Sequence, residues 1–406
     1  MPDVGFTNLF AVALIALLAP LLLGLAPRLR VPAVVLEIVA GIVVGPHGLG
    51  LVDVDLAVQI VALLGLAFLL FLAGLEIDVH QLRGQVLRLA VLGYLVTLVL
   101  GGAAGAAFSA VGWVHSALLV AVTLSATSLG LVVPVLKDAG QVDGSVGQFT
   151  IAAASVADFA AVLLLSLVFS TEGGSAGERL IMVGLFAVLV VVTGVVVATA
   201  GRSRRIGLVL LRLQDTTAEI RVRAAVLLLV AFVALAAQFG LETILGAFLA
   251  GAVVGLVDRS DDSHPRFRIK LEALGYGFLI PVFFVTSGLR LDLGGLFADT
   301  AALLRVPLFL VALLVVRGVP AYLSVRTLGV RSSTAAGLLQ ATSLPFIVTA
   351  TQIGVATGLM SPVTAAALVC AGLLSVLLFP AAALALLRRP DDAARSAPEA
   401  PRPASK

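Results

Sequence analysis

One carboxylate stands in the middle of a long apolar run, where it is well placed to do chemistry. Asp158 lies about halfway along the run 148–169, and a charged carboxylate at such a depth in a membrane costs about 2.5–3.5 kcal/mol. An exchanged proton or cation would offset that cost, and burial favours the protonated form. We therefore expect Asp158 to bind a proton and a cation alternately, with Ser155 on the same helical face as a further ligand. The alternative is a structural aspartate held in a permanent hydrogen bond or ion pair.

Two other apolar runs, 116–136 and 332–356, each contain a cluster of hydroxyl residues followed by proline. Proline cannot donate a hydrogen bond to the carbonyl four residues earlier, and freed carbonyls at membrane depth must line a cavity or face protein. Oxygen ligands of this kind suit Na⁺ or K⁺, although such clusters also merely pack or kink helices. The expected cation ligands are Thr127, Ser128 and Thr342. The residues expected to break the helices are Gly130, Pro134, Ser343 and Pro345.

Three more charged residues lie within apolar runs. Arg317 stays protonated in proteins and cannot carry the proton, so we expect it to balance the charge of Asp158 or of another carboxylate, or to serve the fold alone. Glu37 and Glu242 lie on two short runs near a membrane face and are interpreted as carboxylates that reach the interface or begin a helix. The four histidines have no partner at metal-ligand spacing, so no cofactor, resident metal centre or enzymatic site is expected.

The composition indicates the elements that must position these residues. The chain is 60% hydrophobic and only 12% charged, whereas soluble domains contain about 25% charged residues. Its apolar runs are longer than the alternating segments of about 10 residues that form β-barrels. The sequence therefore predicts an all-α polytopic membrane protein whose solvent is the lipid bilayer. The net charge of +3 needs no nucleic-acid partner, since basic residues in such proteins report topology.

About thirteen membrane spans are expected. Their approximate ranges are 6–26, 31–46, 58–75, 89–110, 116–136, 148–169, 180–200, 218–238, 241–257, 271–288, 301–325, 332–356 and 361–386. Most Lys and Arg residues then fall on one side, which predicts an outside N-terminus and a cytoplasmic C-terminus, with Arg179, Arg290 and Arg305 outside. Residues 1–387 form the membrane domain, and the Pro- and Ala-rich tail 388–406 is expected to be a disordered cytoplasmic segment.

Three short stretches of the first half recur in the second half in the same order. The stretch 39–45 (VAGIVVG) resembles 249–255 (LAGAVVG), 74–78 (GLEID) resembles 288–292 (GLRLD), and 126–128 (ATS) recurs at 341–343. The offset is about 210 to 215 residues each time. An odd number of spans separates the partners, so they cross the bilayer in opposite directions. We expect inverted repeats of six spans each, over 6–169 and 218–386, around a linker helix at 180–200.

These stretches resemble the monovalent cation:proton antiporter-2 family. The sequence 125–136 (SATSLGLVVPVL) is similar to that family's broken helix, and 71–76 (FLAGLE), 246–251 (GAFLAG) and 281–285 (PVFFV) are similar to other stretches typical of it. The likeness covers residues 6–386. It implies a homodimer, a mobile six-helix core that works by elevator-like alternating access, and a crossing of spans five and twelve beside Asp158. Arg317 resembles the basic position on the family's corresponding helix.

One position departs from the family's electrogenic members, which carry two adjacent aspartates. Here Ala157 precedes Asp158, so one titratable carboxylate would exchange one proton for one monovalent cation, Na⁺ or K⁺. The expectation is electroneutral antiport in a bacterial inner membrane, with cation export driven by an inward proton gradient. Two alternatives on the same scaffold are a transporter of a small organic solute and a gated cation channel.

Overall fold

The computed structural model describes residues 5–25, 31–76, 84–138, 140–169, 176–201, 219–258, 265–298 and 300–387. The tail 388–406, expected to be disordered, and several basic loop residues lie outside these ranges. Within them the chain is helical and contains no β-strand. The predicted all-α class is therefore confirmed.

The first half contains α1 (Thr7–Leu25), α2 (Ala33–Val44), α3 (Leu56–Leu75), α4 (Gly84–Ala110), α5 (Ala117–Ser125), α6 (Leu129–Asp138) and α7 (Ser145–Phe169). The middle contains α8 (Ala176–Gly201), α10 (Ile220–Gln238) and α11 (Thr243–Asp258). The remainder contains α12 (Pro265–Leu274), η1 (Gly275–Leu279), α13 (Ile280–Leu289), α14 (Leu293–Ala298), α15 (Thr300–Leu313), η2 (Leu314–Gly318), η3 (Val319–Ser324), α16 (Val325–Leu328), α17 (Val330–Gln340), α18 (Pro345–Ala356) and α19 (Pro362–Leu387).

Many of these helices are suited to a lipid environment. In the described part of the chain, nine helical segments are long and apolar enough to cross a membrane, and some of them join consecutive elements, such as α5 with α6. The number is ten if the bent pair α17–α18 is one span. Three shorter apolar helices cover Ala33–Val44, Ile181–Val195 and Thr243–Val257. The protein is thus a multi-pass membrane protein, and the count of thirteen spans stays a prediction.

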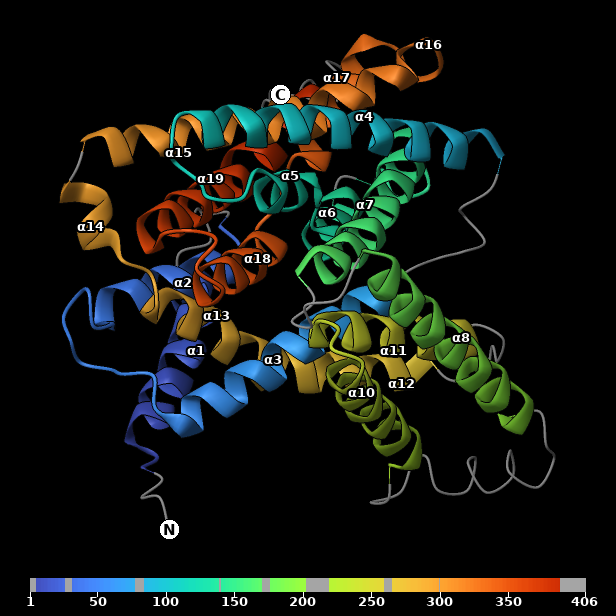
Figure 1. Ribbon diagram of the computed structural model, residues 1–406, viewed down its shortest axis with the longest axis horizontal. Coiled ribbons are helices and arrows are strands. Elements are labelled where there is room, and N and C mark those ends of the chain that lie inside the picture. The colour runs from blue at the N-terminus through green and yellow to red at the C-terminus, as the bar shows by residue number, and fades with distance from the viewer. Residues whose placement is uncertain are drawn as a thin grey trace, which may run out of the picture.

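The helices form two bundles, one above the other in Figure 1. The core bundle, at the top, consists of α4 to α7 and α15 to α19 with η2 and η3. The frame bundle, below it, consists of α1 to α3, α8 and α10 to α13 with η1. Along the sequence the chain leaves the frame bundle after α3, returns to it at α8 and leaves it again through α14. Each bundle therefore takes helices from both halves of the sequence.

Glycines let α3 and α11 of the frame bundle touch along their backbones. A Cβ atom added to Gly251 would lie 1.9 Å from the carbonyl oxygen of Phe71, and one added to Gly74 would lie 2.0 Å from that of Phe248. Small residues allow such approach between helices in membranes, where dispersion replaces the hydrophobic effect as the driving force. This crossing joins the GLE stretch of one half to the LAG stretch of the other.

A second crossing of the same kind joins α2 to α13. A Cβ atom on Gly41 would lie 2.2 Å from the carbonyl oxygen of Val285, and one on Gly288 would lie 2.1 Å from that of Ile38. Gly41 and Gly251 come from one pair of recurring stretches, and Gly74 and Gly288 from another. In one crossing the first half supplies the AG stretch and the second half the GL stretch, and in the other crossing the reverse holds. An inverted repeat would give this arrangement.

We expect Gly251→Ala to destabilise the protein by about 1–3 kcal/mol or more, because the new methyl group would overlap a backbone oxygen that cannot rotate away. The measurement is the thermal unfolding midpoint of the detergent-solubilised protein. Gly184→Ala is the matched control, since nothing lies within 4 Å of a Cβ there and alanine favours a helix. An equal midpoint for the two variants would contradict the close crossing.

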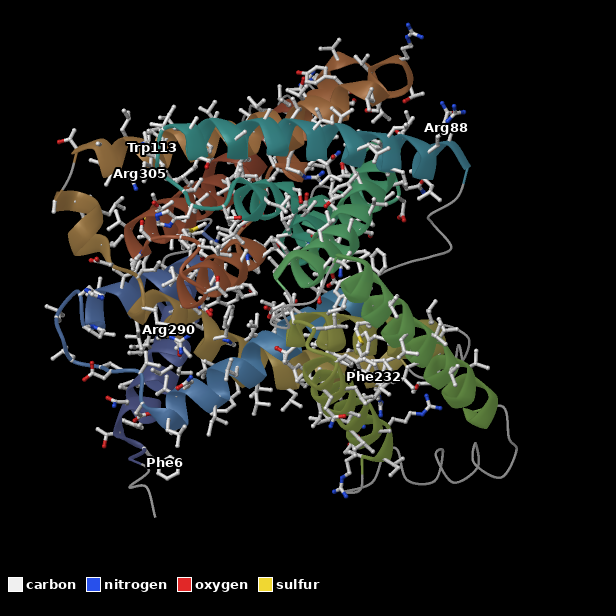
Figure 2. The ribbon with its side chains drawn as sticks, in the orientation of Figure 1. Phe6, Arg88, Trp113, Phe232, Arg290 and Arg305 are labelled. Carbon is white, nitrogen blue, oxygen red and sulfur yellow. The ribbon has the colours of Figure 1, made fainter. Side chains whose placement is uncertain are left out.

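The labelled arginines lie in different parts of the molecule. Figure 2 places Arg290, Arg305 and Trp113 toward the left and Arg88 at the upper right. Arg305 lies over the Trp113 ring at 5.4 Å from its centroid and donates a hydrogen bond to Thr364 (2.8 Å). This contact ties α15 to α19 and to the connection after α4, where an arginine and an aromatic ring suit a membrane interface.

Candidate functional site

The two interrupted helices of the core bundle meet at their interruptions. Residues 126–128 separate α5 from α6, and residues 341–344 separate α17 from α18 with a bend of 41°. The Ser128 N–H donates to the Thr342 carbonyl oxygen at 3.0 Å, and the Thr127 hydroxyl donates to the Gln340 carbonyl oxygen at 2.7 Å. Carbonyl groups released by one interruption are therefore satisfied by the other, as membrane depth requires.

The first interruption does not lie at Gly130 and Pro134, where the sequence predicted it. Gly130 and Pro134 are inside α6, so the prediction that they break this helix is wrong. The chain opens instead at Thr127 and Ser128, where neighbouring groups replace the lost helical hydrogen bonds. In the second interruption, Ser343 lies within the break and Pro345 is the first residue of α18, a position where the missing N–H costs nothing.

Asp158 faces the first interruption from α7. Its Oδ1 accepts a hydrogen bond from the Thr127 N–H at 3.3 Å, and its Oδ2 accepts one from the Leu129 N–H at 3.4 Å. Leu129 begins α6, so the carboxylate sits at the positive end of a helix dipole. Both bonds are long, which leaves the carboxylate oxygens able to accept another ligand. The site thus holds an anion while remaining open to a proton or a cation.

Arg317 reaches this crossing from η2 but does not bond to Asp158. Its side chain is 1% exposed, its Nε donates to the Thr127 Oγ1 at 2.9 Å, and its Nη1 donates to the Thr97 Oγ1 at 3.3 Å. Thr127 therefore stands between the two charges, with its N–H toward Asp158 and its hydroxyl oxygen toward Arg317. The π-helical turn η2 carries the arginine, and such turns are frequent at functional sites.

A cavity of about 300 Å³ lies between the two bundles and reaches Asp158. The core bundle contributes Thr127, Ser128, Leu129 and Asp158 to its wall. The frame bundle contributes polar groups from Glu37, Glu76 and Tyr276 and apolar side chains that include Leu69, Phe248 and Phe284. The cavity thus connects the carboxylate to an apolar vestibule that is large enough for a partly hydrated monovalent cation.

Not every expected ligand lies at the cavity. Asp158, Thr127 and Ser128 line it, whereas Ser155 and Thr342 are buried outside its wall. The Thr342 hydroxyl donates to the Leu338 carbonyl oxygen of α17 at 3.2 Å. Its backbone carbonyl is already engaged by Ser128. Of the expected hydroxyl ligands, that of Ser128 is the best placed to reach an ion.

Three polar residues near the site were not assigned to it from the sequence. Glu76 directly follows the apolar run of α3, and a carboxylate at that boundary is a signal that could have been used. Tyr276, in η1, and Thr97, within α4, stand in apolar stretches with no spacing that sets them apart. Only the folded chain brings these three residues to the cavity or to Arg317.

Known proteins resemble this chain over most of its length. A putative Na⁺/H⁺ antiporter of Bacillus subtilis is 33% identical over 369 residues, which is 87% of this chain and 58% of that protein. The chain thus spans less than two thirds of that relative's length. A probable Na⁺/H⁺ antiporter of Methanocaldococcus jannaschii is 27% identical over 343 residues, covering 83% of this chain and 86% of that protein.

The fold also has a solved counterpart. The sodium proton antiporter MjNhaP1 of Methanocaldococcus jannaschii at pH 8 superposes with a TM-score of 0.69 at 18% identity, over 94% of this chain and 98% of that one. The family model described as sodium/hydrogen exchanger, transmembrane, matches residues 13–388, a range that contains both interruptions, Asp158 and Arg317. The predicted antiporter family is thus confirmed, and the chain belongs to the sodium/hydrogen exchanger family of transmembrane proteins.

Proposed function

We propose that this protein exchanges a monovalent cation, Na⁺ or K⁺, for H⁺ in a 1:1 electroneutral cycle through Asp158. The observation that carries the proposal is the carboxylate of Asp158 at the cavity wall, held by two backbone N–H groups at the crossing of two interrupted helices. The two relatives and the solved structure named above are Na⁺/H⁺ antiporters by name, which supports the same class of transport here.

The proposed cycle alternates two states of one carboxyl group. A proton on Asp158 removes the negative charge and releases the cation, and loss of the proton restores the charge that binds the next cation. Ala157 precedes Asp158 and offers neither a second proton nor an oxygen ligand. Each turn of the cycle then moves one positive charge in each direction, which is the basis for expecting electroneutral exchange.

Ser128 and backbone oxygens of the interruptions are the proposed first ligands beside Asp158. Thr127 was expected to be a ligand, but its hydroxyl oxygen accepts hydrogen bonds from Arg317 and is directed toward a positive charge. We therefore assign Thr127 the role of holding Asp158 through its N–H. Ser155 and Thr342 would become ligands only if the core bundle rearranged when an ion binds.

The two bundles suggest how access alternates. We propose that the core bundle, which carries Asp158, moves against the frame bundle in an elevator-like manner within a homodimer. With the N-terminus outside a bacterial inner membrane, the part of the cavity wall formed by Pro32 and Glu76 would lie toward the cytoplasm. We infer secondary transport and no enzymatic reaction.

Reconstituted protein should move protons when an alkali cation is added to the outside of the liposomes. We expect a change in lumenal pH with Na⁺, Li⁺ or K⁺, and the cation with the lowest half-saturating concentration identifies the substrate. Because the proposed exchange moves no net charge, clamping the membrane voltage at different values should leave the initial rate unchanged. A rate that follows the voltage would contradict the 1:1 stoichiometry.

The same assay separates the two alternatives. A gated channel would pass current without moving protons in fixed proportion, and an organic-solute transporter would respond to none of the alkali cations under an imposed pH gradient. The relatives named above support neither alternative.

A further inference from the structure

A second carboxylate reaches the cavity from the opposite wall. Glu37 lies on α2 of the frame bundle, its side chain is 4% exposed, and it lines the same cavity as Asp158. The interpretation that Glu37 reaches the interface or begins a helix is therefore wrong. The sequence did not show that α2 packs on α13 through Gly41 and Gly288, which places Glu37 inside the protein.

Glu37 differs from the other acidic groups of the cavity in having no partner. Among the described residues no hydrogen bond or ion pair reaches its carboxylate, whereas Asp158 accepts two N–H groups and Glu76 lies 3.8 Å from Arg268. An unpaired charge cannot stay buried without a large free-energy cost. Glu37 must therefore hold a proton or be neutralised by a cation in the cavity.

No basic side chain on the cavity wall can neutralise Glu37, so the cation would have to come from the cavity itself. The titratable groups on the cavity wall beside Glu37 are Asp158, Glu76 and Tyr276, and none of them is basic. Arg317 faces Thr127 and Thr97 and does not line the cavity. A cavity with three carboxyl groups and no cationic side chain on its wall concentrates cations.

Glu37 and Asp158 belong to different bundles, which decides what Glu37 can do. If the core bundle moves during transport, Asp158 travels with the ion and Glu37 stays behind with α2. Glu37 therefore cannot be the group that holds the ion while it crosses the membrane. It can receive an ion on the side where the cavity opens and pass it to Asp158.

We propose that Glu37 is a second, stationary cation-binding site of the cavity, an inference that rests on the proposed function. An entering cation displaces the Glu37 proton into the cavity water and is held by the carboxylate. When the cation moves to Asp158, the proton that leaves Asp158 is taken up by Glu37. One proton is released for each cation bound, Glu37 returns to its starting state, and the exchange stays 1:1.

Infrared difference spectroscopy on the purified full-length protein tests the site directly. In an Asp158→Asn background, adding NaCl or KCl in place of choline chloride should reduce the C=O stretching band of a protonated carboxyl group. The change should disappear in Asp158→Asn with Glu37→Gln and persist in Asp158→Asn with Glu242→Gln. Glu242 is the matched control because it directly precedes the short helix α11, as Glu37 lies on the short helix α2, and because it does not line the cavity.

Transport provides the second readout. We expect Glu37→Gln to raise the half-saturating cation concentration by at least about tenfold when the cation is supplied on the cavity side, with the exchange still insensitive to voltage. Glu37→Asp should restore part of the affinity if the glutamine variant folds poorly. A cation-insensitive band in Asp158→Asn, alongside normal exchange by wild type, would overturn this inference alone. Absence of exchange by wild type would instead overturn the proposed function.

Discussion

Asp158→Asn will reduce cation-dependent proton movement to the rate of protein-free liposomes. Asparagine keeps the shape of the side chain and can accept the hydrogen bond from the Thr127 N–H, but it cannot release a proton or carry the negative charge that binds a cation. The measurement is the initial change in lumenal pH on adding the preferred cation to proteoliposomes. Protein in the membrane should be normal in amount, because the neutral amide removes a buried charge.

Asp292→Asn is the control for this loss of function. Asp292 is also a carboxylate with a backbone partner, since its Oδ1 accepts the Gly295 N–H at 2.8 Å, but it does not line the cavity. We expect its variant to transport at the wild-type rate. Residual exchange by Asp158→Asn that still depends on the cation would show that another group carries the proton, with Glu37 the first to test.

Arg317→Met will destabilise the core bundle and stop transport. The substitution keeps a long apolar side chain but removes the charged donors that satisfy Thr127 and Thr97. Buried hydrogen bonds to a charged group are worth about 1.5–3 kcal/mol each. We expect a comparable fall in the free energy of unfolding, measured as a lower thermal midpoint in detergent.

Arg317→Lys distinguishes charge from geometry. Lysine would restore a positive charge, but its single ammonium cannot reproduce the planar fork that donates from Nε and Nη2 to one oxygen and from Nη1 to another. Recovery of stability without recovery of transport would indicate that the arginine positions Thr127 and thereby Asp158. A methionine variant as stable as wild type would refute the proposed role of Arg317 in holding the crossing.

The sequence predicted those parts of the protein in which a residue type conflicts with its surroundings. A carboxylate amid apolar residues identified Asp158, and hydroxyl clusters followed by proline identified the two runs that turned out to be interrupted. Recurring glycine stretches anticipated a relation between the two halves. Each of these signals is local, because it can be recognised from the residue and its neighbours in the sequence alone.

What the sequence could not supply was the partner of each group across the fold. The sequence left Arg317 either to balance a carboxylate or to serve the fold alone, and its hydrogen bonds go to Thr127 and Thr97, which no spacing along the chain identifies as its partners. The first interruption precedes Gly130 because Asp158 and the second interruption supply bonds there. The sequence assigns Glu37 to the membrane interface because no local pattern reveals that its helix is packed inside.

The glycine crossings make the mechanical compliance of the molecule uneven. At Gly74 and Gly251 one backbone touches another, so this part of the frame bundle has no side-chain rotamers through which it could yield. The frame-bundle wall of the cavity is instead lined by Phe248 and Phe284, rings whose torsions can adjust without moving a helix. Displacement of one bundle against the other would therefore concentrate at the cavity, where surfaces can slide, while the crossed helices act as a rigid support.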